Sequence, residues 1–329
     1  MMFGRQIPSS TLAPAALAAL LCVAAAAAHA QSNVKLSGRV DLNVGKDIGS
    51  GSTRMGTGAM SHLSFSGNED LGEGRQAYFV LTTRINADTG TTNNPGSILN
   101  NPPGTFWSQD SYVGLRGTWG SLTLGRRMTA ALLPQIMVDP WQWDNTTTIF
   151  NATTGLIGNL WYNNSVTYDY ADGAFSLTAQ VAEKDANPGW AGVARKAPYS
   201  FALNYVPGPW QVRLGFERPA DGRSRLLSLF GGYDFGAFTL NAMLGDGRDY
   251  LENKVRTWAV SSIVQAAGGH QVRLAFGQYA RDGDVLSQKL SGGYYHYLSK
   301  RTAVYVNATH DNKAATEKGG YELGLQHVF

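Results

Sequence analysis

The amino-acid sequence predicts an all-β fold, a 16-stranded antiparallel transmembrane β-barrel, from three observations. Apolar and polar residues alternate with a period of two along most of the chain. The segments are joined alternately by tight turns and by long polar loops, which is typical of an up-and-down membrane barrel. The composition, with 39 glycines, 15 tyrosines and 16% charged residues among 329, departs from the roughly 25% charge of an average soluble domain.

The charge and hydrophobicity of the chain exclude several classes of protein. The formal net charge is only +3, and the lysines and arginines form no runs of the kind that follow a phosphate backbone. A chain that is 43% apolar and rich in aromatic residues is too hydrophobic for intrinsic disorder. We therefore expect neither a nucleic-acid partner nor a disordered chain or coiled coil.

The first 30 residues are predicted to be a cleaved signal peptide. Arg5 is the only charge before the apolar stretch 12–28, and the tripeptide Ala-His-Ala at 28–30 has the pattern that signal peptidase cuts. The stretch is mostly alanine and contains a proline, so it would be a poor membrane anchor. Cys22, the only cysteine, leaves with this peptide, and residues 31–329 then form an exported barrel without disulfides.

The strands are placed by the alternation. In the first strand Val34, Leu36 and Val40 lie on one face, and Lys35 and Arg39 lie on the other. Sixteen such segments are expected, at residues 32–44, 59–67, 74–87, 106–117, 120–128, 160–170, 174–182, 198–206, 210–218, 225–235, 237–245, 254–264, 270–280, 285–298, 301–310 and 320–329. No segment of comparable length shows a helical stripe.

The connections between the strands come in two sizes. Tight turns are expected at residues 117–120, 171–173, 207–209, 236, 267–269 and 299–300. Longer polar loops are expected at residues 45–58, 88–105, 129–159, 183–197 and 311–319. A soluble sandwich also alternates with a period of two, but its strands are usually shorter, about five or six residues.

The number of strands decides which face meets lipid. About eight strands fill a barrel with their own side chains, whereas sixteen leave an aqueous lumen. The polar positions must then line water and the apolar positions must face lipid. Aromatic residues near strand ends, such as Phe235 and Phe238, fit the girdles found at membrane interfaces.

Six short phrases occur in a fixed order along the mature chain, at residues 34–41, 66–74, 112–126, 163–166, 298–302 and 324–329. They read VKLSGRVD, SGNEDLGEG, YVGL followed by LGR, NNSV, LSKRT and GLQHVF. Together they resemble the trimeric Gram-negative outer-membrane porins of the beta-proteobacterial type. The resemblance covers the whole mature chain.

This resemblance implies short periplasmic turns, long extracellular loops and a third loop that folds into the lumen. It also implies a homotrimer in the outer membrane of a Gram-negative bacterium, which lets small hydrophilic solutes and ions diffuse passively and needs no cofactor. The terminal Phe329 lies on the apolar parity of Leu325 and Leu323. By the same resemblance, Phe329 is the signal that the barrel assembly machinery reads.

In such porins the third loop places carboxylates opposite a wall of basic side chains. The matching loop here, residues 129–159, contains Asp139 and Asp144. No lysine or arginine occurs between residues 128 and 182, so the charge of the loop is purely negative. Low-dielectric walls would focus the field between the loop and the basic wall on the narrow water column.

Five residues are expected to form the basic wall of the constriction: Arg39, His62, Arg84, Arg126 and Arg127. Arg39 faces the lumen by clean alternation. Of the two neighbouring arginines, alternation favours Arg127 and the resemblance favours Arg126 as the residue that faces the lumen, so both assignments stay open. His62 stands where relatives often carry arginine, which makes this wall thinner and leaves strong anion selectivity in doubt. A histidine with its ordinary pKa of about 6.5 either loses its charge as pH rises or acts only through hydrogen bonds.

Four aromatic residues of this region allow two interpretations: Trp141, Trp143, Phe150 and Trp161. Their faces could stack on sugar rings or other planar solutes, which would make a substrate-selective channel. Alternatively, they wedge the loop against the barrel wall, and this is the simpler interpretation.

Two other functions are compatible with a barrel. An enzyme needs a nucleophile, a base and an orienting group in reach, and no recognisable catalytic phrase surrounds the histidines of the mature chain. We therefore expect no enzyme and, without suitable clusters of metal-ligating residues, no metal site. A non-conducting surface adhesin stays open, because exposed loops on a rigid scaffold can bind partners.

Overall fold

The computed structural model describes residues 33–58, 60–92, 105–143, 145–186 and 195–329. The signal-peptide prediction for residues 1–30 therefore lies outside the described residues, and so does Asp144 of the third loop.

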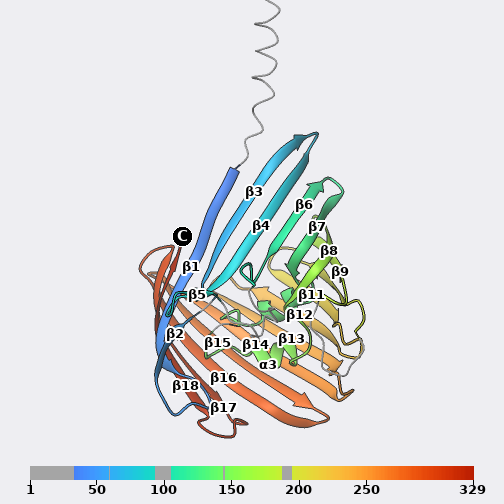
Figure 1. Cartoon of the computed structure of the whole chain (residues 1–329). Coiled ribbons are helices and arrows are strands. Elements are labelled where there is room, and N and C mark those ends of the chain that lie inside the picture. Colours follow the sequence, from blue (N-terminus) through green and yellow to red (C-terminus); the bar gives the residue numbers. More distant parts are fainter. Residues whose placement is uncertain (1–32, 59, 93–104, 144, 187–194) are drawn as a thin grey trace, which may run out of the picture.

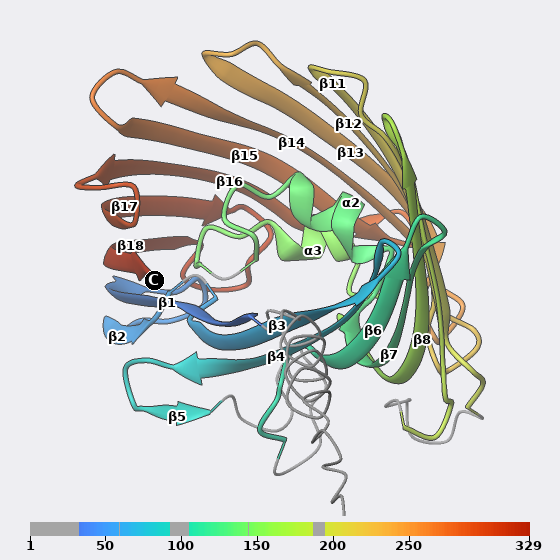
Figure 2. The same cartoon turned by 90° about the horizontal axis from the view of Figure 1, so that it is seen from above.

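Within the described residues, 18 strands form one antiparallel sheet that closes into a barrel (Figures 1 and 2). The sheet closes because β1 (Asn33–Lys46) pairs with β3 (His62–Gly72) on one side and with β18 (Gly319–Val328) on the other. Two short strands, β2 (Arg54–Thr57) and β5 (Thr91–Thr92), belong to long loops, and the other sixteen form the wall. The predicted fold class is thereby confirmed.

The remaining wall strands are β4 (Arg75–Asn86), β6 (Ser111–Gly117), β7 (Gly120–Met128), β8 (Trp161–Asp172), β9 (Phe175–Ala182), β10 (Tyr199–Tyr205), β11 (Trp210–Arg218), β12 (Arg225–Asp234), β13 (Phe238–Arg248), β14 (Lys254–Ala266), β15 (His270–Arg281), β16 (Asp284–Tyr297) and β17 (Thr302–Asp311). Two short helices, α2 (Leu132–Met137) and α3 (Phe150–Thr154), lie in the loop between β7 and β8.

Each of the sixteen predicted strands corresponds to one wall strand, with small shifts at the ends. The largest shifts, of five residues, are in β3, which ends at Gly72 rather than at residue 67, and in β6, which begins at Ser111 rather than at residue 106. Before Ser111, Gln109 and Asp110 still form backbone hydrogen bonds with Thr82 of β4, whereas the carbonyl of Ser108 accepts a hydrogen bond from Arg126 at 2.8 Å. A tight turn at residues 282–283 joins β15 to β16 at the end of the barrel where the long loops lie. The alternation of short and long connections did not predict this turn.

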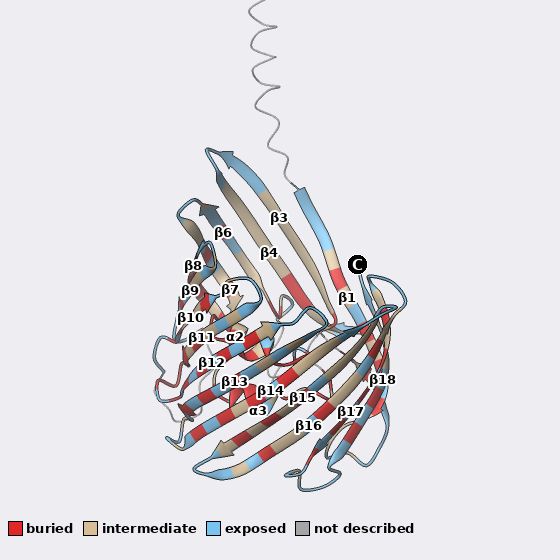
Figure 3. Ribbon diagram, turned by 180° about the vertical axis from the view of Figure 1, so that it is seen from behind, coloured by how far each residue is buried: buried red, intermediate tan, exposed pale blue. Residues whose placement is uncertain are grey.

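The two faces of each strand differ as a barrel in lipid requires. In β12, Leu227 and Leu229 are 45% and 46% exposed, whereas Ser228 between them is fully buried. The same alternation of buried and exposed residues runs along many strands in Figure 3. Apolar side chains therefore cover the outside. The inside carries small polar side chains together with buried apolar ones, such as Leu226 and Phe230, that pack against the loop between β7 and β8.

Among the described residues, no helix is both long enough and apolar enough to cross a membrane.

The chain ends at the seam between the first and last strands. The backbone N–H of Phe329 donates to the carbonyl of Gly38 on β1, and the N–H of Gly38 donates back to the carbonyl of Phe329, both at 3.0 Å. A Cβ atom at position 38 would lie 2.5 Å from the ring of Phe329, so glycine leaves the space that the ring occupies. Phe329 thus extends the pairing that closes the barrel.

Candidate pore constriction

The loop between β7 and β8, residues 129–160, lies inside the barrel and is called the third loop below (Figure 2). Its helix α2 contacts β11 to β13, and its helix α3 contacts β13 to β16. The backbone N–H of Ala130 donates to the hydroxyl of Ser200 on β10, at 3.0 Å. A Cβ atom at Gly277 of β15 would lie 2.5 Å from the Cβ of Ala152, so this glycine lets α3 approach the wall. We call strands β10 to β18 the anchoring wall.

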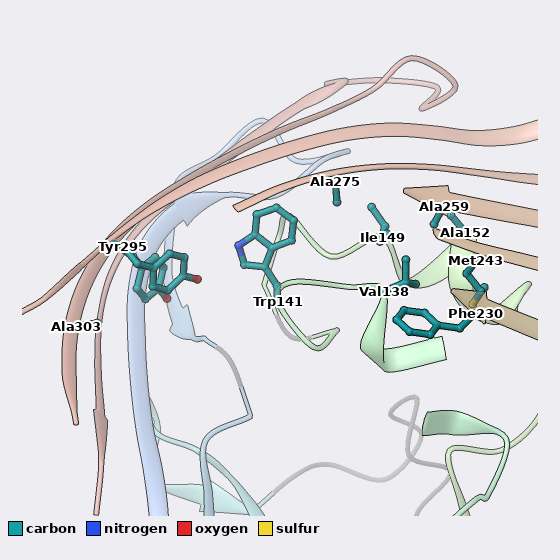
Figure 4. Close-up of a cluster of buried hydrophobic side chains, with 11 residues drawn as sticks. Val138, Trp141, Ile149, Ala152, Phe230, Met243, Ala259, Ala275, Tyr295 and Ala303 are labelled. Carbon is teal, nitrogen blue, oxygen red and sulfur yellow. The ribbon is translucent and has the colours of Figure 1, made fainter. Parts of the chain in front are cut away.

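An apolar cluster joins the third loop to the anchoring wall (Figure 4). The loop contributes Val138, Trp141, Ile149 and Ala152, and the wall contributes Phe230, Met243, Ala259, Ala275, Tyr295, Ala303 and Tyr305. Trp141 is 1% exposed, and its indole N–H donates to the side-chain oxygen of Asn307 at 3.1 Å. A large ring that is both buried and hydrogen-bonded fixes the loop in one position.

Charged side chains of the wall bind the tip of the loop. The carboxylate of Glu322 accepts hydrogen bonds from the side-chain amide of Asn145 at 2.6 Å, from the backbone N–H of Thr146 at 3.3 Å and from Asn307 at 2.7 Å. The ammonium group of Lys289 donates to the carbonyl of Thr146 at 2.6 Å. Such charge-assisted bonds are stronger than neutral ones.

A stack of three side chains connects the loop to the barrel seam. Arg273 donates to the carbonyl of Pro140 at 2.9 Å, and its guanidinium carbon lies 3.8 Å from the ring centroid of Tyr295. The ring of Tyr295 stacks on that of Tyr305, with centroids 4.9 Å apart. The hydroxyl of Tyr305 donates to Asp41 on β1 at 2.6 Å, so the stack reaches the first strand.

Two carboxylates hold the end of the loop. Glu217 on β11 accepts from the backbone N–H of Asn159 at 3.1 Å and from the hydroxyl of Tyr162 at 2.9 Å. Asp110, just before β6, accepts from the indole N–H of Trp161 at 2.9 Å. Burial raises the pKa of the Asp110 carboxyl above its ordinary value.

Asp139, predicted as a constriction carboxylate, lies inside the loop. Its side chain is only 2% exposed and accepts hydrogen bonds from the backbone N–H groups of Trp141 at 3.0 Å and Ile149 at 3.2 Å, and from the hydroxyl of Thr148. Burial raises the pKa of this carboxyl above its ordinary value. In this position Asp139 ties together the two arms of the loop.

Three residues of the predicted basic wall share one row on neighbouring strands. Arg39 on β1 is paired with His62 on β3, which is paired with Arg84 on β4. Residues paired directly across antiparallel strands lie on the same face, and Asp41, two residues from Arg39 on that face, is buried inside the barrel. The row therefore faces the lumen, and we call it the basic row.

The other two predicted arginines lie farther along the wall. A bulge between Gly125 and Arg127 interrupts the pairing of β7 with β8. Arg127 donates to the carboxylate of Asp169 at 2.6 Å and to the hydroxyl of Thr123 at 3.1 Å, so it lies on the lumen face. Arg126 is 8% exposed, and it is enclosed by contacts that include the carbonyl of Ser108.

The four aromatic residues divide into two pairs. Trp141 and Trp161 are buried and hydrogen-bonded, as a wedge between loop and wall would be. Trp143 and Phe150 contact each other edge to face, with ring centroids 5.2 Å apart. They border a cavity of about 350 Å³ that Lys289 also lines.

The residues that bind the loop were not among those predicted from the sequence. Arg273, Lys289, Glu217 and Glu322 are all charged residues on the lumen face of strands. Strand parity alone could have indicated that they point inward. Parity could not have shown that a loop more than a hundred residues away in sequence binds three of them.

Within the described part of the chain, no group of three or more His, Cys, Asp or Glu residues could hold a metal ion.

Comparisons with known proteins agree with this architecture. A family model described as Gram-negative porin matches residues 15–316. Outer membrane porin protein 32 of Delftia acidovorans is 27% identical, over 95% of this chain and 99% of its own length.

Two solved structures share the fold. The anion-selective porin from Comamonas acidovorans superimposes with a TM-score of 0.76 at 23% identity, covering 91% of this chain and 100% of its own. The trimer form of OmpT, an outer membrane protein of Vibrio cholerae, gives a TM-score of 0.69 at 10% identity, covering 91% and 99%.

Proposed function

The chain belongs to the Gram-negative porin family, and from this premise we propose that its third loop and its basic row together form the constriction of a passive diffusion channel. The protein is an outer-membrane porin of a Gram-negative bacterium. Porins of this family and fold are channels rather than enzymes. What we propose beyond this concerns the residues of the constriction, the preferred ions and the assembly.

One observation carries the assignment of the constriction. The third loop crosses the lumen and is bound to the anchoring wall by Trp141, Glu322 and Arg273. A loop fixed to one side of a barrel narrows the water column. The water column that remains then lies next to the other side of the barrel. There the basic row presents Arg39, His62 and Arg84 to the passing solute. The basic row would then set the ion preference.

The ion preference that we propose is a moderate preference for anions. Asp139 is buried and hydrogen-bonded within the loop, so it would act on permeating ions weakly. Arg127 is compensated by Asp169. The basic row would then dominate the local field. Asp144 stays a prediction as the carboxylate that opposes the row.

We also propose a homotrimer, folded with the help of the barrel assembly machinery and of Phe329. The trimer form of a protein with the same fold supports the first part, and the position of Phe329 at the closing seam supports the second. Cross-linking of the native membrane tests the first part. Deletion of Phe329 should lower the yield of assembled barrel rather than change conductance.

Reversal potential in a salt gradient across a planar bilayer tests the constriction. Changing Asp144 to Asn should shift the selectivity towards anions, whereas changing Asp139 to Asn should leave it nearly unchanged. Conductance with an unchanged reversal potential in both variants would remove both carboxylates from the constriction. A refolded barrel that does not conduct would instead favour a surface adhesin.

A further inference from the structure

The outer wall of the barrel carries a groove between β15, β16 and β17. It has a volume of about 550 Å³ and is lined by Leu274, Leu290, Gly292, Tyr294, Val306 and Ala308, among others. The groove exists because position 292 has no side chain: a Cβ atom there would meet only Leu274, at 3.6 Å. Leu274, Leu290 and Val306 are 47%, 58% and 49% exposed, so this groove opens outward, towards lipid.

A cluster of polar rings lies at the periplasmic end of the groove. The hydroxyl of Tyr294, which lines the groove, lies 2.6 Å from Nδ1 of His270. Nδ1 of His296 lies 3.1 Å from the same nitrogen, and the two imidazole rings stack with centroids 4.7 Å apart. Rings with one apolar side and one polar side are typical of the level of the lipid headgroups.

The charge of this face is of one sign. Residues 264–281 and 285–310 contain no aspartate or glutamate, although they include the whole periplasmic half of β15 to β17. The turn after β16 adds the exposed Lys300 and Arg301. The acidic residues of these strands, Asp284 and Asp311, lie at the opposite, extracellular end. The periplasmic end of the groove is therefore complementary to an anion.

We propose that this face binds a glycerophospholipid with a negatively charged headgroup, drawn from the periplasmic leaflet of the outer membrane. One acyl chain lies in the groove, and the phosphate lies against His270, His296 and the turn with Lys300 and Arg301. The groove extends along β16 from Tyr294 to Leu290, four residues or about 13 Å of strand. That length, the apolar walls and the cationic end together fit a lipid better than a second barrel.

The test compares two variants in which a glycine is changed to valine, one inside the groove and one outside it. Gly292→Val fills the groove, whereas Gly231→Val places the same side chain on the outer face of β12, where a Cβ atom meets nothing within 4 Å. Both proteins are purified in detergent, incubated with phosphatidylglycerol or phosphatidylcholine, and examined by native mass spectrometry. Planar-bilayer conductance checks that both variants are folded.

We expect the wild-type protein and Gly231→Val to retain phosphatidylglycerol, and Gly292→Val to retain about tenfold less, a change equivalent to 1.4 kcal/mol. Changing His270 and His296 to Gln should keep lipid binding but reduce the preference for phosphatidylglycerol over phosphatidylcholine. Equal retention by Gly292→Val and Gly231→Val would overturn the proposal. So would a Gly292→Val protein that loses its oligomeric state, because the groove would then be a contact between copies.

Discussion

The two sides of the barrel interior use their polar side chains differently. On the anchoring wall, Glu322, Lys289 and Arg273 each bind an atom of the third loop. On the opposite side, Arg39 and Arg84 are paired in register with His62 on the strand between them. We propose that side chains of the anchoring wall fix the shape of the pore and that those of the basic row set its field. Stability and ion preference should therefore respond to different mutations.

The largest expected effect is on the anchoring wall. Changing Trp141 to Ala removes a buried ring and leaves Asn307 without the indole donor, which should destabilise the packing of the loop by about 3–5 kcal/mol. Single-channel recordings should show increased current noise. In a separate heating experiment, the temperature of thermal inactivation should be lower than that of the wild-type protein. Trp210→Ala is the control, because Trp210 is 59% exposed on the outer face. A quiet, stable Trp141→Ala channel would contradict a fixed loop.

The second effect concerns the tip of the loop. Glu322→Ala removes an acceptor of three hydrogen bonds and leaves buried donors unsatisfied, at a cost of about 1–3 kcal/mol. We expect rapid current flicker, measured at constant voltage in symmetric salt. Glu317→Ala removes an equal charge from an exposed ion pair with Lys46 and should not cause flicker. Equal flicker in both variants would assign the effect to charge rather than to the loop.

A smaller effect is expected at Asp139. An asparagine there keeps the shape but offers one oxygen in place of two, so part of the hydrogen bonding to Trp141, Thr148 and Ile149 is lost. The expected cost is about 1 kcal/mol, seen as a small increase in noise with little change in reversal potential. A large shift in selectivity would place the Asp139 charge in the field of the pore and break the division between the two sides.

The smallest effect is expected for Trp143. The ring is 7% exposed, so it offers little surface on which a sugar or an aromatic solute could stack. Replacing it with Ala should change the half-blocking concentration of a maltose-type solute by less than about twofold, because the buried ring does not stack on the solute in the wild-type protein. A saturable block that disappears in this variant would favour a substrate-selective channel in which these rings stack on the solute.

The fold was predictable because the period of two is a local property of each strand. In β1 the alternation of Val40, Asp41 and Leu42 is enough to assign the faces. The inward position of Arg39 was predictable in the same way, from the alternation of the first strand. The register that aligns Arg39 with His62 and Arg84 depends on loop lengths and pairing, which single strands do not specify.

The contacts of the third loop could not be predicted from local pattern. Asp139 was expected to face the lumen because it is an acidic residue in an inward loop, but acceptors are also needed for the loop's own N–H groups. The pairing of Trp141 with Asn307 spans 166 residues. A contact between residues so far apart in the sequence produces no periodic pattern from which it could be predicted.

The reversal potential in a salt gradient tests most directly whether the basic row sets the ion preference. The variant Arg39→Gln with Arg84→Gln should lower the anion-to-cation permeability ratio by a factor of about two to five, as expected for about 0.5–1 kcal/mol of screened charge interaction. Arg256→Gln removes a positive charge that is 68% exposed, from an ion pair with Asp246, and should leave the ratio unchanged. An unchanged ratio in the double variant, or an equal shift in Arg256→Gln, would contradict the account.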